Sequence, residues 1–107
     1  MNFLQGTLDV LILRALERER LHGYDIVTWI REASGGVLAI EEGALYTALH
    51  RMEARAWLSA EWATSPKGRR AKYYRLTAAG RRQLQRGERE WVRFSGAVGS
   101  IFRRGEA

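Results

Sequence analysis

One segment of the sequence carries charge of a single sign. Residues 65–77 contain five cationic side chains and no acidic one. The five are Lys67, Arg69, Arg70, Lys72 and Arg75. Arginine and lysine bind phosphate oxygens through charge-assisted hydrogen bonds. Like charges at this spacing repel one another within a screening length of roughly 10 Å. The segment therefore favours a polyanionic partner over the alternative, a solvated surface with no partner.

The rest of the chain is much less basic. The 107 residues have a formal net charge of +6 and a pI of about 10.5. Residues 1–66 hold six arginines and nine acidic residues, a net charge of −3, whereas residues 67–93 hold ten basic and two acidic residues, a net charge of +8. The length and the 46% hydrophobic content fit one globular domain. The expected binding side is therefore the basic segment and the residues that follow it.

Several classes of site are not expected. The chain has no cysteine, which excludes disulfides and thiolate metal sites and fits a cytoplasmic location. Its two histidines, His22 and His50, lack the partners of a metal site. Glu41 and Glu42 are adjacent, so on a helix they diverge by about 100° and form no catalytic pair. No apolar run approaches the roughly 20 residues that cross a bilayer. We therefore expect no metal, no cofactor, no membrane segment and no enzyme activity.

Apolar residues at helical spacing predict two helices near the start of the chain. We expect the first to begin at Thr7, which can cap it, with Asp9 in its first turn. The second is expected within residues 21–36, with a core side formed by Ile26, Trp29, Ile30 and Ala33. The next four residues, 37–40, are apolar and partly β-branched, which predicts a short strand.

A third helix is predicted within residues 41–57, and its two sides differ. The expected core side consists of Leu45, Ala48, Leu49, Met52 and Ala56. The outer side is small and polar near the N-terminus, so it can approach a DNA groove closely. Its candidate DNA-contacting residues are Gly43, Ala44, Tyr46, Thr47, His50 and Arg51. The alternative is an ordinary amphipathic helix with no partner.

Two alternating segments, residues 58–64 and 69–77, flank a turn that contains Pro66 and predict a β-hairpin. In the first segment Leu58, Ala60 and Trp62 share one face, opposite Ser59, Glu61 and Ala63. In the second segment Tyr74 and Leu76 are expected to point inward. Tyr73 is expected to point outward, and Arg75 either points outward or packs back on the body. The candidate DNA-contacting residues of the hairpin are Lys67, Arg69, Arg70, Lys72 and Tyr73.

Thr77 is expected to cap a long final helix. Leu84, Trp91 and Val98 are seven residues apart, and Gly87, Phe94 and Ile101 follow each of them by three, which predicts a coiled-coil seam and a homodimer. The expected dimer-interface residues are Phe3, Val10, Leu84, Trp91, Phe94, Val98 and Ile101. Trp91 either fills this seam or, with Phe94 and Ser95, stacks a planar aromatic ligand between two subunits.

The predicted order is helix, helix, short strand, helix, two strands and helix, which is mainly α with a small β-hairpin. It is the order of a winged helix-turn-helix, in which the third helix enters a DNA groove and the hairpin is the wing. Residues 1–77 are the expected DNA-binding region. Residues 78–107 are the expected dimerisation helix, within one compact domain.

The chain also resembles the PadR family of bacterial transcriptional regulators along nearly its whole length. The matching stretches, in the family's order and spacing, are QGTLDVLILRAL, LHGYDIVTWI, EEGALYTALHRMEARAWL and GRRAKYYRLTAAGRRQL. The resemblance implies a winged helix-turn-helix with a single C-terminal dimerisation helix, as in the short subfamily. Members usually repress transcription, bind palindromic operators as homodimers and release them on ligand or stress signals.

The resemblance also implies residue roles. Tyr46, Thr47 and Arg51 fall on the recognition helix, residues 67–73 on the wing, and Trp91 where some drug-sensing relatives place a ligand-stacking tryptophan. Many relatives have SLYPAL where this chain has ALYTAL, so Ala44 and Thr47 depart from the common pattern.

The sequence thus predicts a ligand-responsive repressor that binds double-stranded DNA as a homodimer. Two other classes stay open. One is a dimeric interaction module that uses its basic face on a protein or an anionic membrane. The other is a small enzyme with its chemistry between the subunits, for which the sequence offers no catalytic group.

Overall fold

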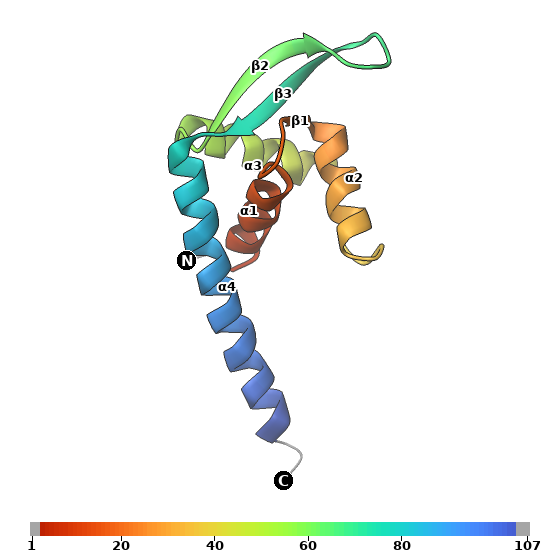
Figure 1. Cartoon of the computed structure of the whole chain (residues 1–107). Helices are drawn as coiled ribbons and strands as arrows, with labels where there is room; N and C mark the ends of the chain where they lie inside the picture. Colours follow the sequence, from red (N-terminus) through yellow and green to blue (C-terminus); the bar gives the residue numbers. More distant parts are fainter. Residues whose placement is uncertain (1–2, 105–107) are drawn as a thin grey trace.

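The computed structural model describes residues 3–104, with side chains described for residues 6–104. Its elements are α1 (Phe3–Ala15), β1 (Leu21–His22), α2 (Gly23–Ala33), α3 (Glu42–Ala54), β2 (Leu58–Thr64), β3 (Arg70–Leu76) and α4 (Ala78–Arg104). Helix α1 lies between α2 and α4, α3 runs beneath the hairpin, and α4 leaves the body as a long rod (Figure 1). The molecule measures 58 × 28 × 23 Å. The predicted fold class is confirmed.

The three strands form one antiparallel sheet in the order β1-β3-β2. Leu58 pairs with Leu76 at the base of the hairpin, and Thr64 pairs with Arg70 near its tip. The strand expected at residues 37–40 is wrong, because that segment has no regular structure. The free edge of β3 is instead occupied by β1, whose two residues come earlier in the chain.

The core lies where α1, α2 and α3 meet beneath the base of the hairpin. Its largest fully buried side chains are Ile12, Leu13, Leu16, Ile26, Leu45, Leu49 and Met52. Trp29 is 39% exposed, so its expected core position is wrong. Helix α2 is rotated so that the buried side runs through Gly23, Ile26 and Ile30.

Helix α1 begins earlier than predicted. Thr7 lies inside the helix rather than at its start, because the residues before it include good helix formers and no proline. Asp9 is therefore in the middle of α1, where it is 8% exposed and forms an ion pair with Arg51 of α3. Burial raises the pKa of the Asp9 carboxyl, although the hydrogen bond and charge of Arg51 lower it. The pair ties α1 to α3 inside the body.

Helix α3 ends in a Schellman arrangement. The Trp57 amide donates to the Met52 carbonyl at 3.0 Å, and the Ala56 amide donates to the Glu53 carbonyl at 2.9 Å. Ala56 adopts a φ of 61°, a left-handed conformation that usually holds glycine. The expectation that Ala56 belongs to the core stripe is wrong, because the helix has already ended and Ala56 is exposed.

Helix α4 starts against this turn. Thr77 Oγ1 accepts a hydrogen bond from the Gly80 amide at 3.0 Å, which confirms the predicted cap, and it donates to the Ala56 carbonyl at 2.6 Å. A Cβ atom on Gly80 would lie 2.1 Å from the Trp57 carbonyl oxygen. Glycine therefore allows the first turn of α4 to touch the end of α3.

The first half of α4 packs on α1 of the same chain. A Cβ atom on Gly87 would lie 2.3 Å from Val10 Cγ2, so the two helices approach closely at this point. Leu84 is 3% exposed within the single subunit, so its expected place in a subunit interface is wrong. The heptad pattern marked an apolar side of α4 correctly, but α1 covers the beginning of that side. Phe3 begins α1, and its side chain lies outside those described.

The left-handed residue at the end of α3 generates a stability prediction. Ala56→Gly should raise the free energy of unfolding by about 0.5–1 kcal/mol, because glycine avoids the roughly 1–2 kcal/mol that an L side chain costs there and offsets part of this gain through chain entropy. Urea denaturation followed by circular dichroism at one fixed protein concentration measures it.

A matched control is Ala54→Gly at the exposed last residue of α3. Its φ requires no glycine, so this change should lower the free energy of unfolding by up to about 1 kcal/mol. Equal destabilisation by the two glycines would contradict the account of the helix end.

Candidate nucleic-acid interface

The tip of the hairpin β2–β3, called the wing below, is a tight turn that presents cations. The Ser65 amide donates to the Arg69 carbonyl at 2.7 Å, and the Gly68 amide donates to the Ser65 carbonyl at 2.9 Å. Gly68 has a φ of +80°, a left-handed conformation that glycine adopts without strain. The exposed side chains of Lys67, Arg69 and Arg70 project from this turn, and none of them forms an ion pair with any residue that the structure describes.

The two cations nearer the base of the wing are neutralised. Lys72 Nζ lies 3.1 Å from Glu53 Oε1 of α3, and this hydrogen bond raises the pKa of Lys72. Arg75 lies 3.0 Å from Glu61 Oε1, which also binds Arg20. Hydrogen bonds from Arg20 and Arg75 lower the pKa of the Glu61 carboxyl. The unpaired positive charge of the wing therefore lies at its tip.

Tyr73 does not extend this charged surface. The Arg20 guanidinium lies over its ring at 4.7 Å, and the His22 ring meets it edge-on at 5.3 Å. Tyr73 is 9% exposed, so the expectation that it points outward toward DNA is wrong. The physical reason is β1, which pairs with β3 and brings Arg20 and His22 over this face of the hairpin.

Helix α3 has the two sides that its sequence predicts. Its buried residues are Leu45, Ala48, Leu49 and Met52. Its outer side exposes Gly43, Ala44, Tyr46, Thr47 and His50. Arg51 differs from these residues, because its side chain is 23% exposed and paired with Asp9. The outer side is consequently small, polar and nearly free of bulky charge.

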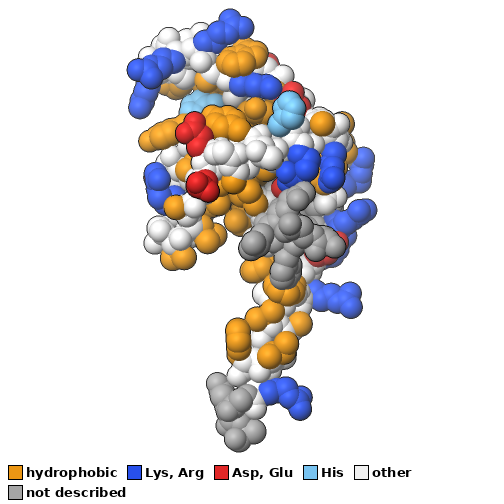
Figure 2. Space-filling model, turned by 180° about the vertical axis from the view of Figure 1, so that it is seen from behind, with side chains coloured by type: hydrophobic (Ala, Val, Ile, Leu, Met, Phe, Trp, Pro, Cys, Tyr) orange, Lys and Arg blue, Asp and Glu red, His pale blue; other side chains and the backbone are white. Residues whose placement is uncertain are grey.

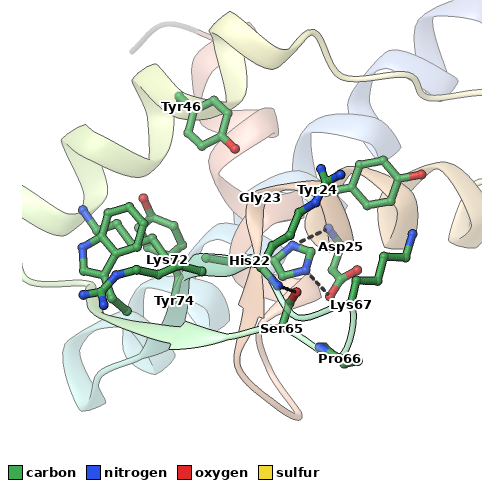
Figure 3. A pocket seen from close by; sticks show the side chains of 14 residues that line it. His22, Gly23, Tyr24, Asp25, Tyr46, Ser65, Pro66, Lys67, Lys72 and Tyr74 are labelled. Atoms are coloured by element: carbon green, nitrogen blue, oxygen red, sulfur yellow. Dashed lines mark hydrogen bonds and ion pairs between the residues drawn. The ribbon is translucent and has the colours of Figure 1, made fainter.

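A groove of about 920 Å³ separates the wing from the N-terminal ends of α2 and α3 (Figure 3). His22 caps α2, with its Nδ1 accepting from the Asp25 amide at 3.3 Å and its Nε2 lying 3.3 Å from Asp25 Oδ2. Tyr46 reaches across from α3, so close that a Cβ atom on Gly23 would lie 2.6 Å from its hydroxyl oxygen. Gly23 therefore lets the outer side of α3 and the start of α2 form one continuous wall.

Two aromatic side chains of this groove were not expected there. Tyr24 is 68% exposed at the start of α2, and Trp62 is 58% exposed on β2. The alternation of β2 correctly placed Trp62 on the same face as Leu58 and Ala60. The body ends beneath Ala60, however, so the ring of Trp62 reaches the groove instead of the core. Both aromatics belong to the groove lining.

A second exposed surface follows the distal half of α4, where hydrophobic side chains gather on one side of the rod (Figure 2). Its most exposed members are Trp91, Ile101 and Phe102, between 45% and 75% exposed. The rings of Trp91 and Phe94 lie 5.9 Å apart. Within residues 3–104, no helix has both the length and the apolar character of a membrane span.

Comparisons with known proteins agree with this arrangement. A transcriptional regulator from Clostridium thermocellum is similar to the chain with a TM-score of 0.81 and 27% identity, over 91% of this chain and 94% of the other. A PadR family transcription regulator from Clostridium difficile is 35% identical with a TM-score of 0.73, over 89% and 96% of the two chains.

A third structure, Bacillus subtilis PadR in complex with operator DNA, has a TM-score of 0.65 over 79% of this chain and 46% of that one. At 24% identity it is a likeness of fold. The sequence pattern of the transcriptional regulator PadR-like family matches residues 12–86, which is more than half of the chain. Its members are transcription regulators rather than enzymes, as the sequence predicted. The chain belongs to the PadR-like family of transcriptional regulators.

Proposed function

We propose that the chain is a repressor that binds duplex DNA as a homodimer, with α3 in the major groove and the wing on backbone phosphates. The observation that carries the proposal is the distribution of charge on the wing. Lys72 and Arg75 are neutralised by carboxylates, whereas the three cations at the tip are paired with none in the described part of the chain. Phosphates of a nucleic acid are the missing counter-charge. The similar Bacillus subtilis protein, whose structure was determined with operator DNA, supports the same partner.

Helix α3 is suited to reading base edges. Gly43 has no neighbouring atom within 4 Å of a built Cβ, so the helix surface is open at this point. Thr47 and His50 are exposed beside it and carry hydrogen-bonding groups. Small residues allow close approach and polar ones donate or accept in the groove. Phosphate contacts by the wing would then fix the register of α3 on the duplex.

A dimer fits both the exposed side of α4 and the expected operator. Pairing of two distal α4 segments would bury the apolar surface that one subunit leaves open. Two α3 helices related by a two-fold axis read a palindrome whose half-sites lie about one helical turn apart. The proposal of repression in the cytoplasm is based on the resemblance to the PadR family, whose members usually repress transcription.

Salt dependence tests the wing. If the dimer neutralises ~6–8 phosphates, affinity for a duplex selected from a random pool should fall by roughly 10³- to 10⁴-fold between 50 and 200 mM salt. Arg69→Ala with Arg70→Ala should weaken binding to all sequences alike and flatten the salt slope by about 0.9 for each phosphate that the wing no longer neutralises. Fluorescence anisotropy titrations at several salt concentrations measure both effects.

The control for the wing is Arg75→Ala, which removes a cation that Glu61 already neutralises. Its salt slope should stay close to that of the unmodified chain. A slope that Arg69→Ala with Arg70→Ala leaves unchanged would show that the wing tip does not hold phosphates.

The dimer is tested at the end of α4. Ile101 and Phe102 are 67% and 75% exposed in the subunit, so changing both to serine should leave the fold intact. Dimer affinity should fall by roughly 100-fold or more, since burying one large apolar side chain contributes about 1.5–3 kcal/mol. Analytical ultracentrifugation measures it, with Ser100→Ala as the control. An unmodified chain that sediments as a monomer at every concentration would remove the proposed dimer.

The release signal is proposed to be a planar aromatic effector that stacks on Trp91 between the subunits, beside Phe94 and Ser95. Trp91 is 45% exposed and its ring lies 5.9 Å from that of Phe94 at a tilt of 48°, so nearly half of its surface is accessible to a planar molecule. Titration with a panel of planar aromatics should quench tryptophan fluorescence in the unmodified chain and much less in Trp91→Ala. Identical signals from the two proteins across the panel would rule out this site.

A further inference from the structure

Trp62 is an exposed side chain that belongs neither to the core nor to the DNA contacts proposed above. It projects from β2 into the groove, with 58% of its surface exposed. Its neighbours along the same face, Leu58 and Ala60, pack on the body. An indole of that size on the groove side of the wing contributes little to the core, because the body ends beneath Ala60. It is available to a partner that enters the groove.

Arg70 and Trp62 act as one unit across the two strands. The Arg70 guanidinium carbon lies 5.6 Å from the centre of the Trp62 ring, a cation–π distance. Trp62 pairs with Lys72 and Arg70 pairs with Thr64, so the two side chains are diagonal neighbours on one face of the hairpin. The Arg70 guanidinium forms no ion pair with any residue that the structure describes, so its donors remain open to a partner. The unit thus offers an apolar plane beside a cation.

The surroundings of this unit favour an anionic strand. Lys67 and Arg69, whose charges are unpaired among the described residues, also line the groove, as does Lys72, which Glu53 neutralises. The one carboxylate in the described lining is Asp25, which lies against His22. The groove is bordered by the wing on one side and by Tyr46 of α3 on the other (Figure 3). A duplex that contacts both elements has to pass across the opening between them.

We propose that this groove receives one sugar–phosphate strand of the bound duplex, and that Trp62 is a DNA-contacting residue. The indole face packs on a deoxyribose ring, and Arg70 donates to the adjacent phosphate. This assignment rests on the proposed DNA binding. It adds an apolar contact to an interface otherwise made of charges and polar groups, and the contact is to the sugar, which all four nucleotides share.

A contact made by Trp62 should contribute to the affinity for DNA but not to its salt dependence. Trp62→Ala removes contact area but no charge, so it should weaken duplex binding by roughly 10-fold while leaving the salt slope unchanged. Trp62→Phe retains an aromatic face and should weaken binding by only about 3-fold. Trp29→Ala changes an exposed tryptophan on α2 that does not line the groove, and it should bind as the unmodified chain does. Thermal unfolding of each variant checks the fold.

Oxidative footprinting tests the same contact without any substitution. Hydroxyl radicals should oxidise Trp62 readily in the free protein and several-fold more slowly on the selected duplex, whereas oxidation of Trp29 should not change. Mass spectrometry of proteolytic peptides separates the two residues. Full oxidation of Trp62 on the duplex, or unaltered affinity in Trp62→Ala, would overturn the assignment.

The outcomes also distinguish the groove contact from DNA binding itself. Salt-dependent duplex binding with an unprotected Trp62 would reject the groove contact and keep the proposed function. Absence of binding to any duplex at low salt would reject both. Protection of Trp62 by planar aromatics but not by the duplex would assign the groove to a small ligand and reject its role in DNA contact.

Discussion

Burial of one apolar stripe on α3 is the constraint from which the rest of the interface follows. Leu45, Leu49 and Met52 are at most 1% exposed, and burial of each such side chain contributes about 1.5–3 kcal/mol. Successive residues of a helix are about 100° apart, so fixing this stripe inward also fixes Thr47 and His50 outward. The ion pair between Asp9 and Arg51 holds the same helix nearer its C-terminal end. The outer side of α3 is thus set by the core.

In the wing, burial by the body also decides which side chains are exposed, and this burial decreases from the base of the hairpin to its tip. At its base Leu58 and Leu76 are 2% and 8% exposed, and Arg75 beside them is paired with Glu61. Lys72, which is in register with Trp62, is paired with Glu53 of α3. Toward the tip the body no longer supports the hairpin, and both apolar and charged side chains stay uncovered. Distance from the core therefore decides which groups satisfy one another within the chain and which are free to bind a partner.

Helix α4 divides in the same way. Gly80 and Gly87 permit backbone approach to the α3 turn and to Val10, so the first half of the helix is fixed to its own subunit. The heptad spacing places Gly87 in the predicted dimer seam, but in the fold it is a point of close packing against α1 of the same subunit. Beyond it the helix leaves the body and keeps its apolar side. The rigid first half thereby sets the direction in which the exposed half projects from the proposed DNA-reading region.

How much the sequence could predict depends on whether a feature is local. The four predicted helices, the hairpin and the Thr77 cap depend on periodicity and turn residues that lie close together in the sequence, and the structure confirms each of them. Strand β1 has only two residues and forms by pairing with the free edge of β3. A strand this short has no alternation in the sequence from which it could be predicted. Its absence from the prediction is why Tyr73 was expected to be exposed.

Alternation and heptad spacing predict on which side of a strand or helix a residue lies. They do not predict how far along that side the neighbouring helix or strand extends. Trp62 and Leu84 show the two consequences. Trp62 lies on the predicted face of β2, yet beyond the end of the body, and is exposed. Leu84 lies on the predicted side of α4, yet within reach of α1, and is buried in its own subunit. The exposed apolar surfaces of this fold begin where the apolar side of a strand or helix extends beyond the neighbouring element that packs on it. That boundary is a property of the assembled chain, since it depends on the lengths of segments far apart in the sequence.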